Sequence, residues 1–211
     1  MKKGMDPDEM RELVRKGYEE GEYFEHYRKD LAIDDLEKWL LREFLQRVPS
    51  GGTILDLGSG PGVPFDRHLV DEGFSVTGID ISEKHIKMAT NLVPKARFIH
   101  GDFMQNTFDG KFDAIMSLYT IFHIPRNMHR TIFRKMHRWL QKDGVILVSM
   151  GTSNIAFDVQ EFLGVEMAWS SFSIDENLRL ITEAGFETIL TVDDNRDPGE
   201  HHLWILATRK E

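Results

Sequence analysis

Three glycines within five positions, directly after a short apolar segment, constrain this chain more than any other feature. Residues 53–57 (Thr-Ile-Leu-Asp-Leu) are predicted to form a buried strand, and Gly58, Gly60 and Gly62 follow. Glycine permits positive φ and lets a ligand approach the main chain, because it has no Cβ. Pro64 suits the first turn of a helix. The segment therefore predicts the first half of a nucleotide-binding βαβ unit, although a tight turn without a ligand shares the pattern.

The spacing of the glycines separates two classes of ligand. A dinucleotide site carries G-x-G-x-x-G, whereas this chain has G-x-G-x-G, with Val63 where the third glycine of that motif would fall. An acid, Asp56, also precedes the turn. On these residues, segment 54–62 resembles the first motif of class I S-adenosylmethionine-dependent methyltransferases. The resemblance implies that S-adenosyl-L-methionine is the cofactor.

Composition narrows the remaining classes of function. The 211 residues, 29% charged and 41% hydrophobic, fit one folded domain with a proper core. The net charge of −9, without a lysine–arginine cluster, disfavours a nucleic-acid partner. The absence of cysteine excludes disulfides, thiolate nucleophiles and cysteine-held metal clusters, and we expect no metal site. The apolar runs are too short to span a bilayer, so we expect a cytoplasmic protein without a membrane partner.

Two further acids follow predicted strands. Asp80 ends the strand 74–79 and is placed to accept both ribose hydroxyls; it could instead cap a helix, but Ser82 already fits that role. Asp102 and Phe103 follow the strand 97–100. The resemblance implies that Asp102 accepts from the adenine amino group and that Phe103 lies at the ring, whereas the local alternative is an Asx-turn at Asp102.

The end of the strand 111–118 is where the resemblance places the reactive methyl group. His123 and Tyr119 follow this strand and are the predicted catalytic residues, as bases needed only for a weakly nucleophilic acceptor. For any single histidine of the nine, a structural or surface role remains the alternative. The predicted cofactor-binding residues are Tyr23, Asp56, Gly58, Gly60, Gly62, Asp80, Ile81, Asp102, Phe103, Ser117 and Leu118. The predicted substrate pocket consists of Tyr18, Tyr27, Trp169 and His201.

Strands and helices alternate up to residue 150, which predicts an α/β fold whose parallel sheet has helices on both faces. Two final strands, about 187–192 and 202–208, predict an antiparallel C-terminal edge. The resemblance implies one Rossmann-like, seven-stranded, mostly parallel sheet in the order 3-2-1-4-5-7-6. We expect residues 1–50 to form an N-terminal helical cap or lid, and residues 51–211 the methyltransferase domain.

Residues 151–172 interrupt the alternation. They are rich in aromatic side chains but show little regular period, which predicts a functional loop without regular structure on the substrate side. A packing role in the core is the alternative for Trp169.

Together these features predict an enzyme that moves a methyl group from S-adenosyl-L-methionine to a small molecule by direct in-line displacement. A non-catalytic S-adenosylmethionine-binding module and an NAD(P)-dependent Rossmann oxidoreductase remain alternatives. A nucleobase amino-methyltransferase is disfavoured, because the Asp/Asn-Pro-Pro-aromatic run of that family is replaced by Ser-Leu-Tyr-Thr at 117–120. The acceptor, the methylated atom and the choice between monomer and homodimer stay open.

Overall fold

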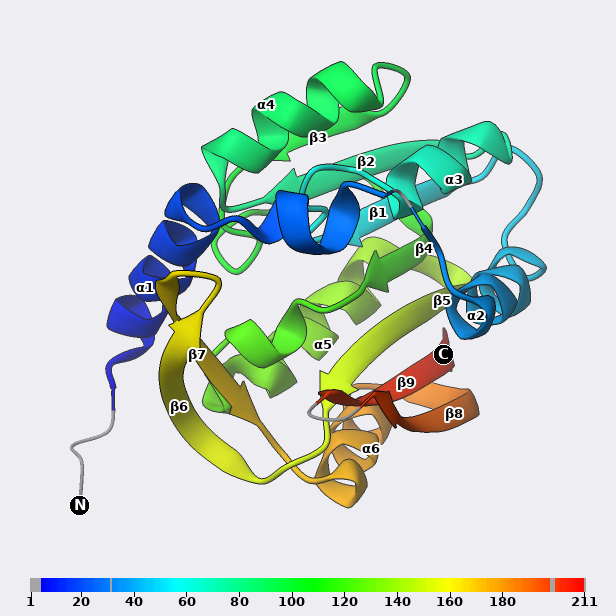
Figure 1. Cartoon of the computed structure of the whole chain (residues 1–211). Helices are drawn as coiled ribbons and strands as arrows, with labels where there is room; N and C mark the ends of the chain where they lie inside the picture. Colours follow the sequence, from blue (N-terminus) through cyan, green and yellow to red (C-terminus); the bar gives the residue numbers. More distant parts are fainter. Residues whose placement is uncertain (1–4, 31, 198–199, 211) are drawn as a thin grey trace.

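The fold is taken from a computed structural model, which describes residues 5–30, 32–197 and 200–210. Its centre is a mostly parallel sheet of seven strands in the order β3-β2-β1-β4-β5-β9-β8 (Figure 1). The strands are β1 (Thr53–Leu57), β2 (Ser75–Asp80), β3 (Arg97–His100), β4 (Phe112–Ser117), β5 (Leu140–Gly151), β8 (Phe186–Asp197) and β9 (Glu200–Arg209). Only β9 runs antiparallel to its neighbours β5 and β8. The predicted α/β class, strand order and antiparallel edge are confirmed.

Helices cover both faces of this sheet (Figure 1). They are α1 (Pro7–Glu20), α2 (Asp35–Leu45), α3 (Phe65–Asp71), α4 (Glu83–Leu92), α5 (His129–Trp139) and α6 (Ile174–Glu183), with a π-helical turn η1 (Phe24–Arg28) and 3-10 turns η2 (Ile121–His123) and η3 (Arg126–Met128). Apolar residues of α2 and α3, such as Phe44 and Leu69, pack on one face. Those of α5 and α6, such as Phe133 and Ile181, pack on the other. Burying two such faces is the main source of stability for a sheet of this kind.

The prediction of a loop without regular structure at 151–172 is wrong. This segment folds into an antiparallel hairpin outside the main sheet, β6 (Ile155–Phe162) and β7 (Val165–Ser171). Leu163 and Gly164 form its turn, with φ of 52° and 80°, the left-handed pair typical of two-residue hairpin turns. The segment could not be recognised from its period, because buried and exposed residues do not alternate cleanly along either strand.

Helix α1 lies across the hairpin (Figure 1). Met10 and Val14 of α1 form a small buried cluster with Met167 and Ala168 of β7. At this crossing a Cβ on Gly17 would lie 2.7 Å from the Met167 Cε and 3.1 Å from the Glu166 carbonyl oxygen, so glycine lets the helix and the strand approach closely. The helix begins at Asp6, whose side chain accepts from the Asp8 backbone N–H in a capping box. The hairpin thus holds α1 above the carboxyl ends of the central strands.

No helix in the described part of the chain combines the length and the hydropathy that crossing a bilayer requires.

Candidate active site

A cavity of about 680 Å³, open solvent at its mouth included, lies at the carboxyl ends of β1, β2 and β4. The strand order reverses between β1 and β4, and ligands of open α/β sheets bind at such a reversal. Eleven of the predicted site residues line this cavity: Tyr18, Tyr23, Gly58, Gly60, Asp80, Ile81, Asp102, Phe103, Leu118, Tyr119 and His123.

The glycine turn forms one wall of the cavity. Gly58 and Gly60 have φ of 82° and 53°, in the left-handed region that favours glycine. A Cβ on Gly58 would lie 2.2 Å from the Thr120 Oγ1, so a side chain there would collide with the strand-end residue opposite. At Gly60, by contrast, no atom lies within 4 Å of the position a Cβ would take. The Gly60 backbone is therefore open to a ligand.

Asp80 is buried beside this turn, with its carboxylate held by main-chain donors. Its Oδ2 accepts from the Gly60 N–H at 2.9 Å, and its Oδ1 accepts from the Ser82 N–H at 2.8 Å. Ser82 is the N-cap of α4, as predicted, and its hydroxyl oxygen accepts from the His85 N–H. Each carboxylate oxygen has two acceptor positions. Asp80 can therefore still accept from two ligand hydroxyls while its orientation is fixed.

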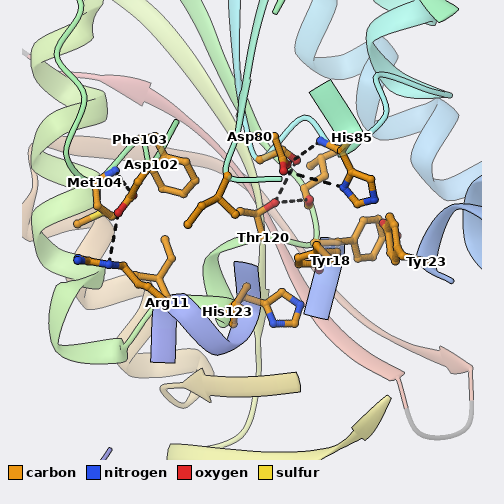
Figure 2. Close-up of a pocket in the computed structure, with 17 residues that line it drawn as sticks. Arg11, Tyr18, Tyr23, Asp80, His85, Asp102, Phe103, Met104, Thr120 and His123 are labelled. Carbon is orange, nitrogen blue, oxygen red and sulfur yellow. Dashed lines mark hydrogen bonds and ion pairs between the residues drawn. The ribbon is translucent and has the colours of Figure 1, made fainter. Parts of the chain in front are cut away.

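The loop after β3 forms the opposite end of the cavity (Figure 2). Asp102 Oδ1 accepts from the Met104 N–H at 2.7 Å, so Asp102 does form the Asx-turn that the sequence left as the local alternative. The other carboxylate oxygen, Oδ2, lies 3.3 Å from the Arg11 Nε. The Lys135 ammonium donates to three carbonyl oxygens of this loop, those of Phe103 (3.2 Å), Met104 (2.5 Å) and Asn106 (3.0 Å). Lys135 thereby fixes the loop that carries the two predicted adenine-side residues.

His123 lies at the remaining side of the cavity and has a defined tautomer. Its Nδ1 is 2.8 Å from the Ala168 carbonyl oxygen, which can only accept, so Nδ1 carries the hydrogen and Nε2 is the acceptor. Burial lowers the pKa of the His123 imidazole to about 4. The ring is therefore neutral at physiological pH.

Tyr119 presents its ring, rather than a free hydroxyl, to the cavity. The hydroxyl donates to the buried Glu37 carboxylate at 2.8 Å, and burial together with that carboxylate raises the pKa of Tyr119. The backbone has a φ of 56°, a left-handed conformation that costs a non-glycine residue about 1–2 kcal/mol. The Ser149 hydroxyl accepts from the Tyr119 N–H at 2.6 Å and supports this conformation.

Three predicted cofactor-binding residues lie behind the cavity wall. Asp56 is buried with Asp66 beneath the glycine turn, and burial raises the pKa of Asp56 to about 7 and that of Asp66 well above its usual range. Gly62 faces β3 and α4, where a Cβ would lie 2.9 Å from the Phe98 ring and 3.2 Å from the Ala89 Cβ. Ser117 donates its hydroxyl to the Leu57 carbonyl oxygen at 2.8 Å and ties β4 to β1.

Three predicted pocket residues also lie outside the cavity lining. Tyr27 and Trp169 belong to a layer of aromatic rings behind Tyr18, Tyr23 and His123. His201 is exposed on the β8–β9 hairpin, where its Nε2 pairs with Asp193. Its neighbour His202 lies closer to the site, with its ring centroid 5.1 Å from that of Tyr119.

Six lining residues were not predicted from the sequence: Arg11, Val14, His85, Met104, Thr120 and Ile124. Arg11 and Val14 lie on an amphipathic helix whose partner is set by tertiary packing, so no local signal marks them. His85 is the third residue of α4, the helix that follows Asp80 and Ser82, and its Nδ1 lies 3.9 Å from the Asp80 Oδ1. Its position next to a predicted ribose-binding acid is a signal that could have identified it.

Comparison with known proteins identifies the domain built around this cavity. Residues 54–144, which contain the glycine turn, Asp80, the Asp102 loop and His123, match a family model described as a methyltransferase domain. Residues 54–144 form a methyltransferase domain of the class I S-adenosylmethionine-dependent type. The sequence-based family assignment is thus confirmed.

Curated relatives of this family member act on different molecules. This chain is 39% identical over 108 residues to the 2-methyl-6-phytyl-1,4-hydroquinone methyltransferase of Synechocystis. The matched region covers 49% of this chain and 33% of the relative. It is 28% identical over 194 residues to the carboxy-S-adenosyl-L-methionine synthase of Nautilia profundicola, covering 79% of this chain and 80% of the relative. Across the three first-ranked curated relatives, the match spans 33–65% of the relative's own length.

A solved structure shares the fold over nearly the whole chain. The 1,6-didemethyltoxoflavin-N1-methyltransferase of Burkholderia thailandensis superposes with a TM-score of 0.74 at 18% identity, covering 98% of this chain and 92% of that one. At this identity the likeness shows the fold alone.

Proposed function

We propose that the chain binds S-adenosyl-L-methionine in this cavity and transfers its methyl group to a small molecule. The observation that carries the proposal is the pairing of Asp80 with Gly60. A buried carboxylate with open acceptor positions lies 2.9 Å from a backbone whose missing side chain leaves room for a ligand. The Burkholderia protein of the same fold was crystallised with bound 1,6-didemethyltoxoflavin and S-adenosylhomocysteine.

In this proposal, different cavity residues contact different parts of the cofactor. Asp80 accepts from the ribose hydroxyls, and the Gly58–Gly60 backbone lies along the amino-acid part. Asp102 and Phe103 hold the adenine, with Arg11 and α1 covering it. Ile81 and Leu118 supply apolar contact, and Tyr23 closes the far end. Asp56, Gly62 and Ser117 act from behind the wall by shaping the turn and the strand end.

The reaction requires mostly positioning from this protein. When bound, the cofactor supplies a methyl group already activated by a positively charged sulfur. Alignment of nucleophile, methyl carbon and sulfur is worth up to about 7–11 kcal/mol in well-oriented reactions. His123 Nε2 accepts the hydrogen of the acceptor's nucleophilic group and orients its lone pair. Tyr119 is a positioning residue in this scheme, because its hydroxyl is engaged by Glu37.

The alternatives are less well supported. An NAD(P)-dependent oxidoreductase would carry a third glycine at position 63, where this chain has valine. A non-catalytic binding module shares every cofactor contact and differs only in turnover. The net charge of −9 supports a small molecule over nucleic acid as acceptor. A cytoplasmic location stays a prediction.

Incubation with methyl-labelled S-adenosyl-L-methionine and a fractionated metabolite extract tests the proposal. We expect label to move into a compound of low molecular mass, and S-adenosylhomocysteine to accumulate in equal amount. Cofactor binding without any transfer would favour the binding module, and label in RNA or DNA would contradict the small-molecule acceptor.

A further inference from the structure

Six aromatic side chains from three separate segments form a closed circuit beside the cavity. In order they are Tyr18, Tyr23, Tyr27, Phe162, Trp169 and His123, and consecutive ring centroids lie 5.3–6.0 Å apart. Tyr18 comes from α1, Tyr23 directly precedes η1 and Tyr27 lies within it; the next two come from the β6–β7 hairpin, and His123 from η2. Separations of about 4.5–7 Å are those at which aromatic pairs attract one another. We call these six residues the aromatic circuit.

Three members of the circuit, Tyr18, Tyr23 and His123, line the cavity, and the other three support them from behind. Figure 2 shows Tyr18 and Tyr23 on the side away from Arg11 and Asp102, with His123 nearby. The circuit runs from His123, which is 7% exposed, to Tyr27, which is 38% exposed. It therefore connects the buried end of the cavity with the surface.

The charges around the circuit argue against a charged acceptor. The Arg28 guanidinium lies 5.5 Å from the Tyr23 ring centroid and 5.3 Å from that of Tyr119, so a cation already occupies the outer side of this wall. A second cation would be repelled. An anionic acceptor would need a counter-charge inside the cavity. Arg28 is not among the described residues that line it, and the Arg28 Nε donates to the Tyr23 hydroxyl at 3.1 Å. The one permanently cationic side chain among the described lining residues is Arg11, which pairs with Asp102 at the opposite end.

His123 adds one polar requirement. Its Nδ1 donates to the Ala168 carbonyl oxygen, so the ring is oriented by the hairpin and offers Nε2 as an acceptor. Because the imidazole pKa is lowered to about 4 by burial, His123 is a weak base that serves to orient an N–H or O–H group. The acceptor must therefore give up its proton readily as the new bond forms, as an acidic aromatic hydroxyl or ring N–H does.

We propose that the methyl acceptor is an uncharged, planar aromatic molecule whose ring packs against Tyr18, Tyr23 and His123 while its O–H or N–H group donates to His123 Nε2. The inference rests on the proposed function. In the transfer, the lone pair of the acceptor's oxygen or nitrogen forms the new bond to the methyl carbon. The carbon–sulfur bond breaks with its electron pair on sulfur, and the acceptor's proton leaves by way of His123 Nε2 or water.

Calorimetric titration of the full chain, saturated with S-adenosylhomocysteine, tests this class of acceptor without turnover. The probes are 2-naphthol, 2-naphthoate and decahydro-2-naphthol, which differ in charge and planarity. We expect 2-naphthol to bind at least tenfold more tightly than either counterpart. Equal or tighter binding of the charged or saturated probe overturns the proposal, as does no binding of 2-naphthol. Failure to bind S-adenosylhomocysteine would instead contradict the proposed function.

Variants locate the probe at the circuit. Y27L and F162L should each weaken 2-naphthol binding threefold to tenfold and change S-adenosylhomocysteine affinity less than twofold. F108L is the matched control, because Phe108 packs with Phe112 and Trp139 away from the circuit; it should leave both affinities unchanged. H123F keeps an aromatic ring but loses the Nε2 hydrogen-bond acceptor. It should therefore weaken the binding of 2-naphthol and leave the binding of 2-methoxynaphthalene, which has no O–H group, unchanged. If Y27L and F162L bind 2-naphthol as the unmodified chain does, the circuit is only packing and the proposal is wrong.

Discussion

The Arg11 Nε lies 3.3 Å from the Asp102 Oδ2 and joins the N-terminal helix to the loop at the far end of the cavity. At its other end, α1 is fastened by Glu19, whose carboxylate accepts from the Glu83 and Lys84 backbone N–H groups at the start of α4. An anionic side chain is favourable at a helix N-terminus. Helix α1 is thus attached on both sides of the cavity, and we expect a ligand to exchange faster when one attachment is removed.

Replacing Arg11 should therefore speed the release of cofactor. In R11M, we expect the dissociation rate of S-adenosylhomocysteine, measured by stopped-flow fluorescence, to rise about threefold to tenfold, because one attachment of α1 is lost. R15M is the control, since Arg15 pairs with Glu12 of its own helix. Equal dissociation rates in the two variants would show that α1 does not control release.

The two glycines of the turn should respond differently to alanine. At Gly60, an added methyl group meets no protein atom. The left-handed backbone should therefore cost G60A about 1–2 kcal/mol of stability. Its affinity for S-adenosyl-L-methionine should fall at least tenfold, because the added methyl group takes the space proposed for the cofactor. At Gly58 the methyl group collides with Thr120, so G58A should have the larger loss in thermal stability. Calorimetric titration and thermal unfolding separate the two effects, and an unaffected affinity in G60A would contradict the placement of the cofactor.

Lys135 should act on cofactor binding although it does not line the cavity. K135M removes the ammonium that holds three carbonyl oxygens of the Asp102 loop. We expect the affinity for adenosine, which lacks the methionine part, to fall at least fivefold, because the loop loses its fixed geometry. R134M, at an exposed neighbouring position, should bind adenosine as the unmodified chain does. Unchanged adenosine affinity in K135M would limit Lys135 to a structural role.

The buried carboxyl pair Asp56–Asp66 should make stability depend on pH. From a usual value of 3.8, burial raises the pKa of Asp56 to about 7, and burial together with the neighbouring Asp56 raises the pKa of Asp66 well above its usual range. The folded state then binds more protons than the unfolded state between about pH 4 and pH 7, so the free energy of unfolding falls as pH rises through this window. D66N replaces a carboxyl that must take up a proton on folding with a neutral amide, so it should be more stable than the unmodified chain at pH 7.5 by at least about 1 kcal/mol. Urea unfolding at pH 5 and pH 7.5 measures this, and a flat pH profile in the unmodified chain would contradict it.

The sequence predicted the sheet because each strand is a short apolar run that ends at a chemically distinctive residue. Asp80 and Asp102 stand directly after strands, and parallel strand ends share one edge, so their meeting at one cavity follows from topology. The hairpin β6–β7 was missed because it buries one irregular patch against α1 instead of a full face. Arg11 and Lys135 were missed for a related reason. In the sequence of an amphipathic helix, a cationic residue that contacts a distant loop cannot be distinguished from one that is exposed to solvent.

The roles of His123 and Tyr119 also needed the structure. Both were selected because they follow β4, and both line the cavity. The sequence could not show that a hairpin carbonyl fixes the His123 tautomer, or that Glu37, 82 residues earlier, engages the Tyr119 hydroxyl. Such pairings depend on contacts distant in sequence.

The central claim is that Asp80 and the glycine turn bind S-adenosyl-L-methionine. Calorimetric titration of the unmodified chain and of D80N with S-adenosyl-L-methionine and with NAD tests it most directly. The carboxylate contributes a charge-assisted hydrogen bond worth about 1.5–3 kcal/mol, so D80N should bind S-adenosyl-L-methionine at least tenfold more weakly. The unmodified chain should bind it at one site and bind NAD weakly or not at all. Tight binding of NAD without S-adenosyl-L-methionine, or equal cofactor affinity in D80N, would contradict the account.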